Sequence, residues 1–173
     1  EVMDHDQLLL TGYTDADLAV WTELVARVFG CAGARPGDLV LNAYGYGLFT
    51  GGLGFHYGAQ RFGCTVIPMS SGNTLRQIAM LHDLRPDILC CTPSYALHLA
   101  EAWRERCFAE SDLSVRASIF GAAPWTHGMR PQTQHQLRLR PVRFERPLWA
   151  IGPPGAGWSF ELTQEPPVSR SAS

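Results

Sequence analysis

The side chains best suited to binding a small molecule lie in a glycine-rich segment, residues 42–52. Tyr44 and Phe49 are aromatic, and the glycines between and after them allow tight backbone turns beside a flat ring. Ligand pockets commonly pack an apolar ring between aromatic side chains. Taken alone, however, the segment favours ordinary core aromatics, because apolar clusters are mostly core.

Other reactive residue types give weaker signals, and the sequence assigns no catalytic residue. A single helical histidine such as His56 is more typical of a packed or capping group than of an acid–base catalyst. The Thr92-Pro93-Ser94 run is typical of a strand end followed by a helix start. No spaced Cys/His pattern indicates a metal site. We interpret the cysteines as free thiols in a reducing cytosol: Cys31, Cys64, Cys90, Cys91 and Cys107.

Short apolar segments alternate with amphipathic ones between residues 14 and 130. This alternation predicts an α/β fold, a parallel sheet of βα units flanked by helices. The expected strands are 39–41, 64–68, 88–92 and 115–120, and the expected helices begin at Thr14, Thr74 and Pro93 or end near Gly63. Residues 42–52, 70–74 and 121–126 follow strands, so we expect them at the ligand-binding edge of the sheet.

Composition limits the classes of partner. Apolar residues make up 46% of the 173-residue chain and charged residues 17%, which indicates a folded domain. The net charge of −2 excludes a global electrostatic grip on nucleic acid. The arginines between residues 130 and 146 leave a local nucleic-acid alternative, but they lack interleaved stacking aromatics, so no nucleic-acid partner is expected. No apolar run is long enough for a membrane span and no signal peptide is visible, so we expect a cytoplasmic protein without a membrane partner.

Four segments together carry a resemblance to a known family. Residues 42–63, 65–78, 87–101 and 119–130 resemble the phenylacetate–CoA ligase family of adenylate-forming enzymes, in the family's order and spacing. The resemblance extends from Gly12 to about Arg130. It implies that residues 12–130 are a partial N-terminal adenylating (AMP-binding) domain.

The resemblance also implies an activity in phenylacetate catabolism. In this family a small aryl carboxylic acid attacks the α-phosphate of ATP, with Mg2+, and forms an acyl-adenylate and pyrophosphate. The thiol of coenzyme A then displaces AMP and gives the thioester. Members of the family are often dimeric.

The family's binding residues can be carried over position by position. Tyr44, Phe49 and Ala122 correspond to the aryl pocket. The loop against the adenine corresponds to residues 121–124, which are Gly121, Ala122, Ala123 and Pro124. The family usually has Glu where this chain has Ala123, so the polar contribution of that side chain is lost.

Several parts of the family's machinery are not recognisable. The phosphate-binding loop should precede Gly12, but residues 1–11 include three acids, which repel a triphosphate. The family's YGLSE block, whose acid helps to hold magnesium, is not in place. All fourteen basic side chains are arginine, so the adenylation lysine is missing. We therefore expect an incomplete or inactive fragment, with a non-catalytic binding domain that retains an aryl or adenine pocket as the alternative.

Residues 131–173 are expected to be irregular, with disorder at the end, because they are rich in Gln, Arg, Pro and Gly without periodicity. One explanation is a shifted reading frame between about Arg130 and Leu148. A message that encodes residues 148–151 can, read one base later, encode Tyr-Gly-Leu-Ser, which is the family's pattern.

Overall fold

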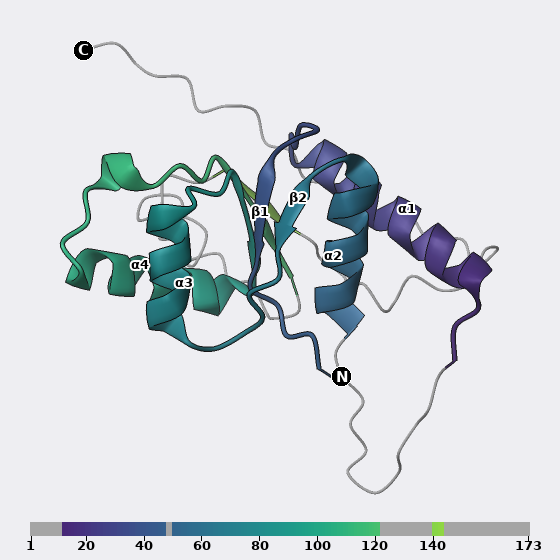
Figure 1. The fold of residues 1–173 in the computed structure, drawn as a ribbon, viewed down its shortest axis with the longest axis horizontal. Helices are drawn as coiled ribbons and strands as arrows, with labels where there is room; N and C mark the ends of the chain where they lie inside the picture. Colours follow the sequence, from purple (N-terminus) through teal and green to yellow (C-terminus); the bar gives the residue numbers. More distant parts are fainter. Residues whose placement is uncertain (1–11, 48–49, 122–139, 144–173) are drawn as a thin grey trace, which may run out of the picture.

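The computed structural model describes residues 12–47, 50–121 and 140–143. Helices and parallel strands alternate along the chain, as the sequence predicts (Figure 1). The helices are α1 (Asp15–Cys31), α2 (Thr50–Phe62), α3 (Thr74–Asp83), α4 (Pro93–Glu105) and a short 3-10 helix (Glu110–Asp112). The strands are β1 (Leu39–Asn42), β2 (Thr65–Ile67), β3 (Ile88–Cys91), β4 (Ala117–Phe120) and β5 (Arg140–Arg143).

The strands form one parallel sheet in the order β2-β1-β3-β4-β5. The predicted α/β class is therefore confirmed. Strand β1 lies between β2 and β3, so after β2 the chain crosses to the other side of β1 and adds the later strands there. Parallel sheets bind ligands where such a reversal opens a crevice at the carboxyl ends of the strands.

Strand β5 corrects one expectation from the sequence. Residues after about 130 were expected to be irregular, but Arg140–Arg143 pairs with β4 in parallel register, with Ala117 opposite Arg140 and Phe120 opposite Arg143. The Arg-Pro-Val-Arg sequence has no strand periodicity to reveal this. The strand forms because β4 presents an unpaired edge, which is a tertiary constraint.

The helix starts follow the caps that the sequence indicates. Thr14 and Asp17 form a reciprocal capping box, with each backbone N–H bonded to the other's side chain, which confirms the predicted start of α1. Asn73 caps α3, and Thr92 caps α4 with Pro93 in the first turn. Asn73 and Thr92 both lie at the carboxyl edge of the sheet, where α3 and α4 begin.

Helices cover both faces of the sheet (Figure 1). One apolar cluster joins α3 and α4 to alternate strand residues that include Cys91, and the other joins α1 and α2 to the intervening residues, which include Cys90. The adjacent cysteines therefore point to opposite faces, as expected for a strand. Burial raises the pKa of both thiols, so they remain protonated and serve as small apolar core groups.

Two glycines allow α1 and α2 to pack closely. A Cβ at Gly54 would lie 2.5 Å from the Trp21 ring, and one at Gly58 would lie 2.6 Å from the Cβ of Val25 and 3.0 Å from its backbone carbonyl carbon. Gly54 and Gly58 are four residues apart and so share one face of α2. The absence of side chains on this face sets the distance between the two helices, and α2 in turn carries the end of the glycine-rich segment.

We expect Gly58→Ala to lower the free energy of unfolding by about 1–3 kcal/mol, because the new methyl group meets the backbone of Val25 and α2 must shift. Urea unfolding followed by tryptophan fluorescence measures the effect. Gly12→Ala is the matched control, since a Cβ there has no neighbour within 4 Å. Equal stability of the two variants would contradict the packing argument.

Candidate functional site

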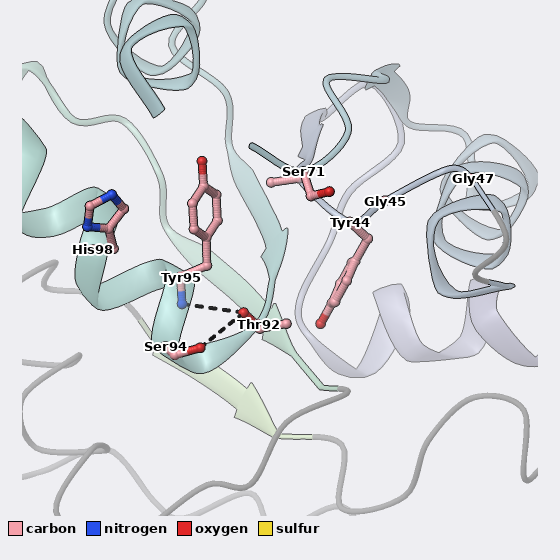
Figure 2. A pocket seen from close by; sticks show the side chains of 9 residues that line it. Tyr44, Gly45, Gly47, Ser71, Thr92, Ser94, Tyr95 and His98 are labelled. Atoms are coloured by element: carbon pink, nitrogen blue, oxygen red, sulfur yellow. Dashed lines mark hydrogen bonds between the residues drawn. The ribbon is translucent and has the colours of Figure 1, made fainter. Parts of the chain in front are cut away.

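A cavity of about 580 Å³ opens at the carboxyl ends of β1, β2 and β3 (Figure 2). One wall is the glycine-rich segment after β1, another is the first turns of α4, and the segment after β2 closes the space between them. The backbone N–H of Ser70 donates to the carbonyl of Asn42, which joins the segment after β2 to the segment after β1. The lining residues are Ala43, Tyr44, Gly45, Gly47, Ser71, Thr92, Ser94, Tyr95 and His98.

The wall after β1 is held by the fully buried side chain of Asn42. Its Nδ2 donates to the carbonyl of Gly52 and to the Tyr46 hydroxyl, both at 2.8 Å, and its Oδ1 accepts from the N–H of Tyr44 at 3.3 Å. One amide thus joins both ends of the segment. Asn42 is not among the site residues predicted from the sequence, although a polar residue that ends a buried strand is a usable signal.

Tyr44 belongs both to the core and to the cavity wall. The residue is only 3% exposed, and its ring stacks on Phe55 at 4.9 Å between centroids. Its hydroxyl donates to the carbonyl of Cys91 at 2.6 Å, and the carbonyl of Gly121 lies 3.3 Å away. Burial raises the pKa of Tyr44 well above its usual value, so the hydroxyl stays protonated and keeps these bonds. Its assignment to an aryl pocket remains a prediction.

Gly121 lies at the end of β4, within reach of Tyr44, so the segments after β1, β3 and β4 meet at one edge of the sheet. Of the three segments predicted to meet at this edge, 42–52 and 70–74 do so, Gly121 of the third lies beside Tyr44, and residues 122–126 lie outside the described residues. The remaining predicted binding residues lie outside the described residues: Phe49, Ala122, Ala123 and Pro124.

The opposite wall consists of polar side chains from the start of α4 (Figure 2). The Thr92 hydroxyl accepts from the N–H of Tyr95 at 3.3 Å and lies 3.4 Å from the Ser94 hydroxyl. The Tyr95 hydroxyl donates to the carbonyl of Gly72 at 3.3 Å, which links α4 to the segment after β2. Residues 92–94 form the helix start that the sequence predicts. Thr92 and Ser94 also line the cavity, which was not predicted. Their place directly after a strand could have indicated it.

The segment after β2 is fixed from beneath by Gln77 of α3, which is fully buried. Its Nε2 donates to the carbonyl of Ser70 at 2.8 Å and to that of Gly72 at 3.3 Å. Asn42 and Gln77 thus have similar roles on neighbouring segments, since the buried side-chain amide of each donates to backbone carbonyl groups.

The lining side chains carry no formal charge when His98 is neutral. Glycine backbone, two tyrosines and hydroxyl groups suit a flat, largely uncharged ring with a few hydrogen-bonding groups. Among the described residues no cluster of three or more His, Cys, Asp and Glu could hold a metal ion. In that same part of the chain, none of the helices combines the length and apolar character that a membrane span requires.

Comparison with known proteins shows which proteins the chain resembles. No protein-family model matches the chain. The chain is 46% identical over 156 residues to a phenylacetate-coenzyme A ligase of Thermus thermophilus, and 42% identical over 160 residues to the Escherichia coli protein of that name. The resemblance to phenylacetate–CoA ligases is confirmed.

A solved structure agrees with this result. A 2-hydroxyisobutyryl-CoA ligase, captured in the postadenylation state with 2-HIB-AMP, superposes with a TM-score of 0.75 at 27% sequence identity. The similarity covers 79% of this chain and 30% of that one. The fold is therefore that of part of an adenylate-forming CoA ligase.

The matches also correct the extent of the resemblance. They cover 90–92% of this chain but only 34–37% of the relatives, so the chain spans about a third of their length. Because the matched stretches are 156 and 160 residues long, they continue past Arg130, where the resemblance was expected to end. The hypothesis of a shifted reading frame between residues 130 and 148 stays a prediction, which the nucleotide sequence tests.

We expect Asn42→Ala to lower the free energy of unfolding by about 2–4 kcal/mol, because buried partners on the backbone lose their bonds together. Tyr46→Phe, which removes only the side-chain partner of Asn42, should lower the free energy of unfolding by about 1 kcal/mol. Urea unfolding measures both, and Gln60→Ala on the exposed face of α2 is the control. An Asn42→Ala protein as stable as the control would show that the amide does not organise this wall.

Proposed function

We propose that these residues form the aryl- and adenine-binding part of a phenylacetate–CoA ligase type of enzyme. The reaction is ATP-dependent activation of an aryl carboxylic acid to its acyl-adenylate and then to the coenzyme A thioester. The observation that carries the proposal is the cavity at the carboxyl ends of β1, β2 and β3, in a chain 41–46% identical to such ligases. A cytoplasmic location belongs to the same proposal and is supported by the five free cysteines.

The roles of individual residues follow from the contacts of the cavity. Tyr44 offers a rigid aromatic wall, because stacking on Phe55 and the bond to the carbonyl of Cys91 fix its ring. We assign the aryl group to this wall, together with Phe49 and Ala122. The adenine is assigned to residues 121–124, which begin where Gly121 approaches the Tyr44 hydroxyl.

The described residues fit the ring-shaped parts of such ligands better than their charged parts. An uncharged wall of glycine, tyrosine and hydroxyl groups accommodates an aryl ring or adenine without a desolvation penalty for buried charge. A triphosphate with Mg2+ needs cationic groups and carboxylates, which this lining does not supply. ATP, Mg2+ and coenzyme A would therefore depend on residues other than these for their phosphate contacts.

We further propose that the 173 residues by themselves do not catalyse adenylation. Residues 1–11 carry three acids where the family has its phosphate loop, and the sequence contains no lysine. Removing one well-placed donor to a transition state typically lowers a rate by about 10²–10³-fold, and several act together here. Binding and chemistry are thus separable in this chain.

The first test is ATP–pyrophosphate exchange with phenylacetate and magnesium, using the purified chain. We expect no acid-dependent exchange above background, because nothing in the cavity lining neutralises the developing phosphate charge. A full-length phenylacetate–CoA ligase measured in parallel is the positive control. Clear exchange that requires phenylacetate would contradict the assignment of the missing parts.

The second candidate function is a non-catalytic domain that still binds an aryl acid or adenine, which the preserved cavity supports. We expect phenylacetate or AMP to raise the melting temperature of the chain, since a ligand that binds only the folded state stabilises it in proportion to its occupancy. Acetate, which has the carboxylate without the ring, is the control. No shift with either ring-bearing ligand at millimolar concentration would exclude this candidate.

A further inference from the structure

His56, which the sequence analysis considered as an acid–base catalyst, has no role in the proposed function. It lies on α2, half-buried, with its Nδ1 3.2 Å from the Tyr46 hydroxyl. The two rings meet edge to face, with centroids 5.8 Å apart. Tyr46 in turn receives a hydrogen bond from Asn42, so His56 is the outer end of a chain of polar groups that leads to the cavity wall.

The donor and the acceptor of each hydrogen bond between Asn42, Tyr46 and His56 can be worked out. Asn42 cannot be turned over, because its Nδ2 faces the carbonyl oxygen of Gly52 and its Oδ1 faces the N–H of Tyr44. The second proton of Nδ2 therefore goes to the oxygen of Tyr46. The hydroxyl of Tyr46 then has its own proton left to donate, and His56 Nδ1 is placed to accept it.

The environment keeps that proton available. Burial, as the largest cause, raises the pKa of Tyr46 to about 12, so the phenol is protonated at neutral pH. An imidazole that accepts at Nδ1 carries its hydrogen on Nε2. The arrangement thus predicts one particular tautomer of His56.

We propose that His56 is a positioning residue for the cavity. By accepting the hydrogen bond of the Tyr46 hydroxyl at Nδ1, it orients the phenol oxygen that accepts a hydrogen bond from Asn42. These bonds together hold residues 43–47 in place as the cavity wall. The effect reaches Tyr44 through its N–H, which Asn42 Oδ1 binds. The proposal concerns the protein without ligand, so it stands or fails independently of the proposed function.

The first test is made on the unsubstituted protein, and a substitution serves only to assign the signal. Histidine side-chain nitrogens of the ¹⁵N-labelled chain are recorded by NMR at neutral pH, with His56 assigned by its disappearance in His56→Asn. We expect Nδ1 of His56 to show the chemical shift of an unprotonated acceptor and Nε2 that of an N–H. A hydrogen on Nδ1 would overturn the proposal, since the Tyr46 proton would then have no acceptor there.

The second test compares two substitutions at His56 by amide hydrogen exchange. Asparagine places its Oδ1 on Cγ, as histidine places Nδ1, and so keeps the acceptor, whereas leucine removes it. We expect His56→Leu to speed exchange at the Tyr44 amide about tenfold, the effect of losing one hydrogen bond, and His56→Asn to restore most of the protection.

Tyr46→Phe should match His56→Leu at the same amide, because both interrupt the chain of bonds at neighbouring links. The amide of Leu99, in the core on the other face of the sheet, should exchange at the rate of the unsubstituted protein in every variant. Equal exchange at Tyr44 in the leucine and asparagine variants would overturn the proposal. If the leucine variant does not fold, the tautomer of the unsubstituted protein still decides.

Discussion

A buried amide at the end of a strand supports the site in this protein. The Ala43 N–H still donates to the carbonyl of Cys90 in β3, and after it the backbone turns away from the sheet. A buried backbone group without a partner is costly, so groups in such a segment need partners outside the sheet. The Asn42 side chain binds two of them at once, the N–H of Tyr44 and the carbonyl of Gly52 in the first turn of α2. The glycine-rich segment can therefore have an irregular shape and still have a fixed position.

Close packing of α1 on α2 supplies the second constraint. Gly54 and Gly58 leave room for Trp21 and Val25, and a Cβ at Gly52 would collide with the carbonyl of Gly45. The glycines of α2 thus have two roles: Gly54 and Gly58 bring the two helices together, and Gly52 lets the start of α2 lie against the backbone of Gly45. Both effects require the absence of a side chain more than flexibility.

Under the proposed function, the cavity binds the ring-shaped groups of the ligands and leaves the phosphate charges to other residues. Its walls are uncharged and rigid, with Tyr44 fixed from behind by Phe55 and Tyr95 joined to the carbonyl of Gly72. Such a site can bind a flat group with little reorganisation, and rigid placement is what an enzyme needs before chemistry begins. In the proposed function, the charges that a triphosphate requires come from residues outside this cavity. The chain spans about a third of its relatives' length.

The local features of the fold and the resemblance to phenylacetate–CoA ligases follow from the sequence. Capping residues at Thr14, Asn73 and Thr92 marked helix starts because side-chain bonds to the first turn act over three residues. Alternating apolar strands and amphipathic helices determined the parallel sheet, and four motifs in one order determined the resemblance. Tertiary structure alone decided the rest. Arg140–Arg143 became a strand only because β4 offered an edge, and Asn42, Tyr46 and His56 became partners only when α2 folded back beside β1. Contacts of that kind depend on the direction of side chains in space, which residue types and spacing along the chain do not specify.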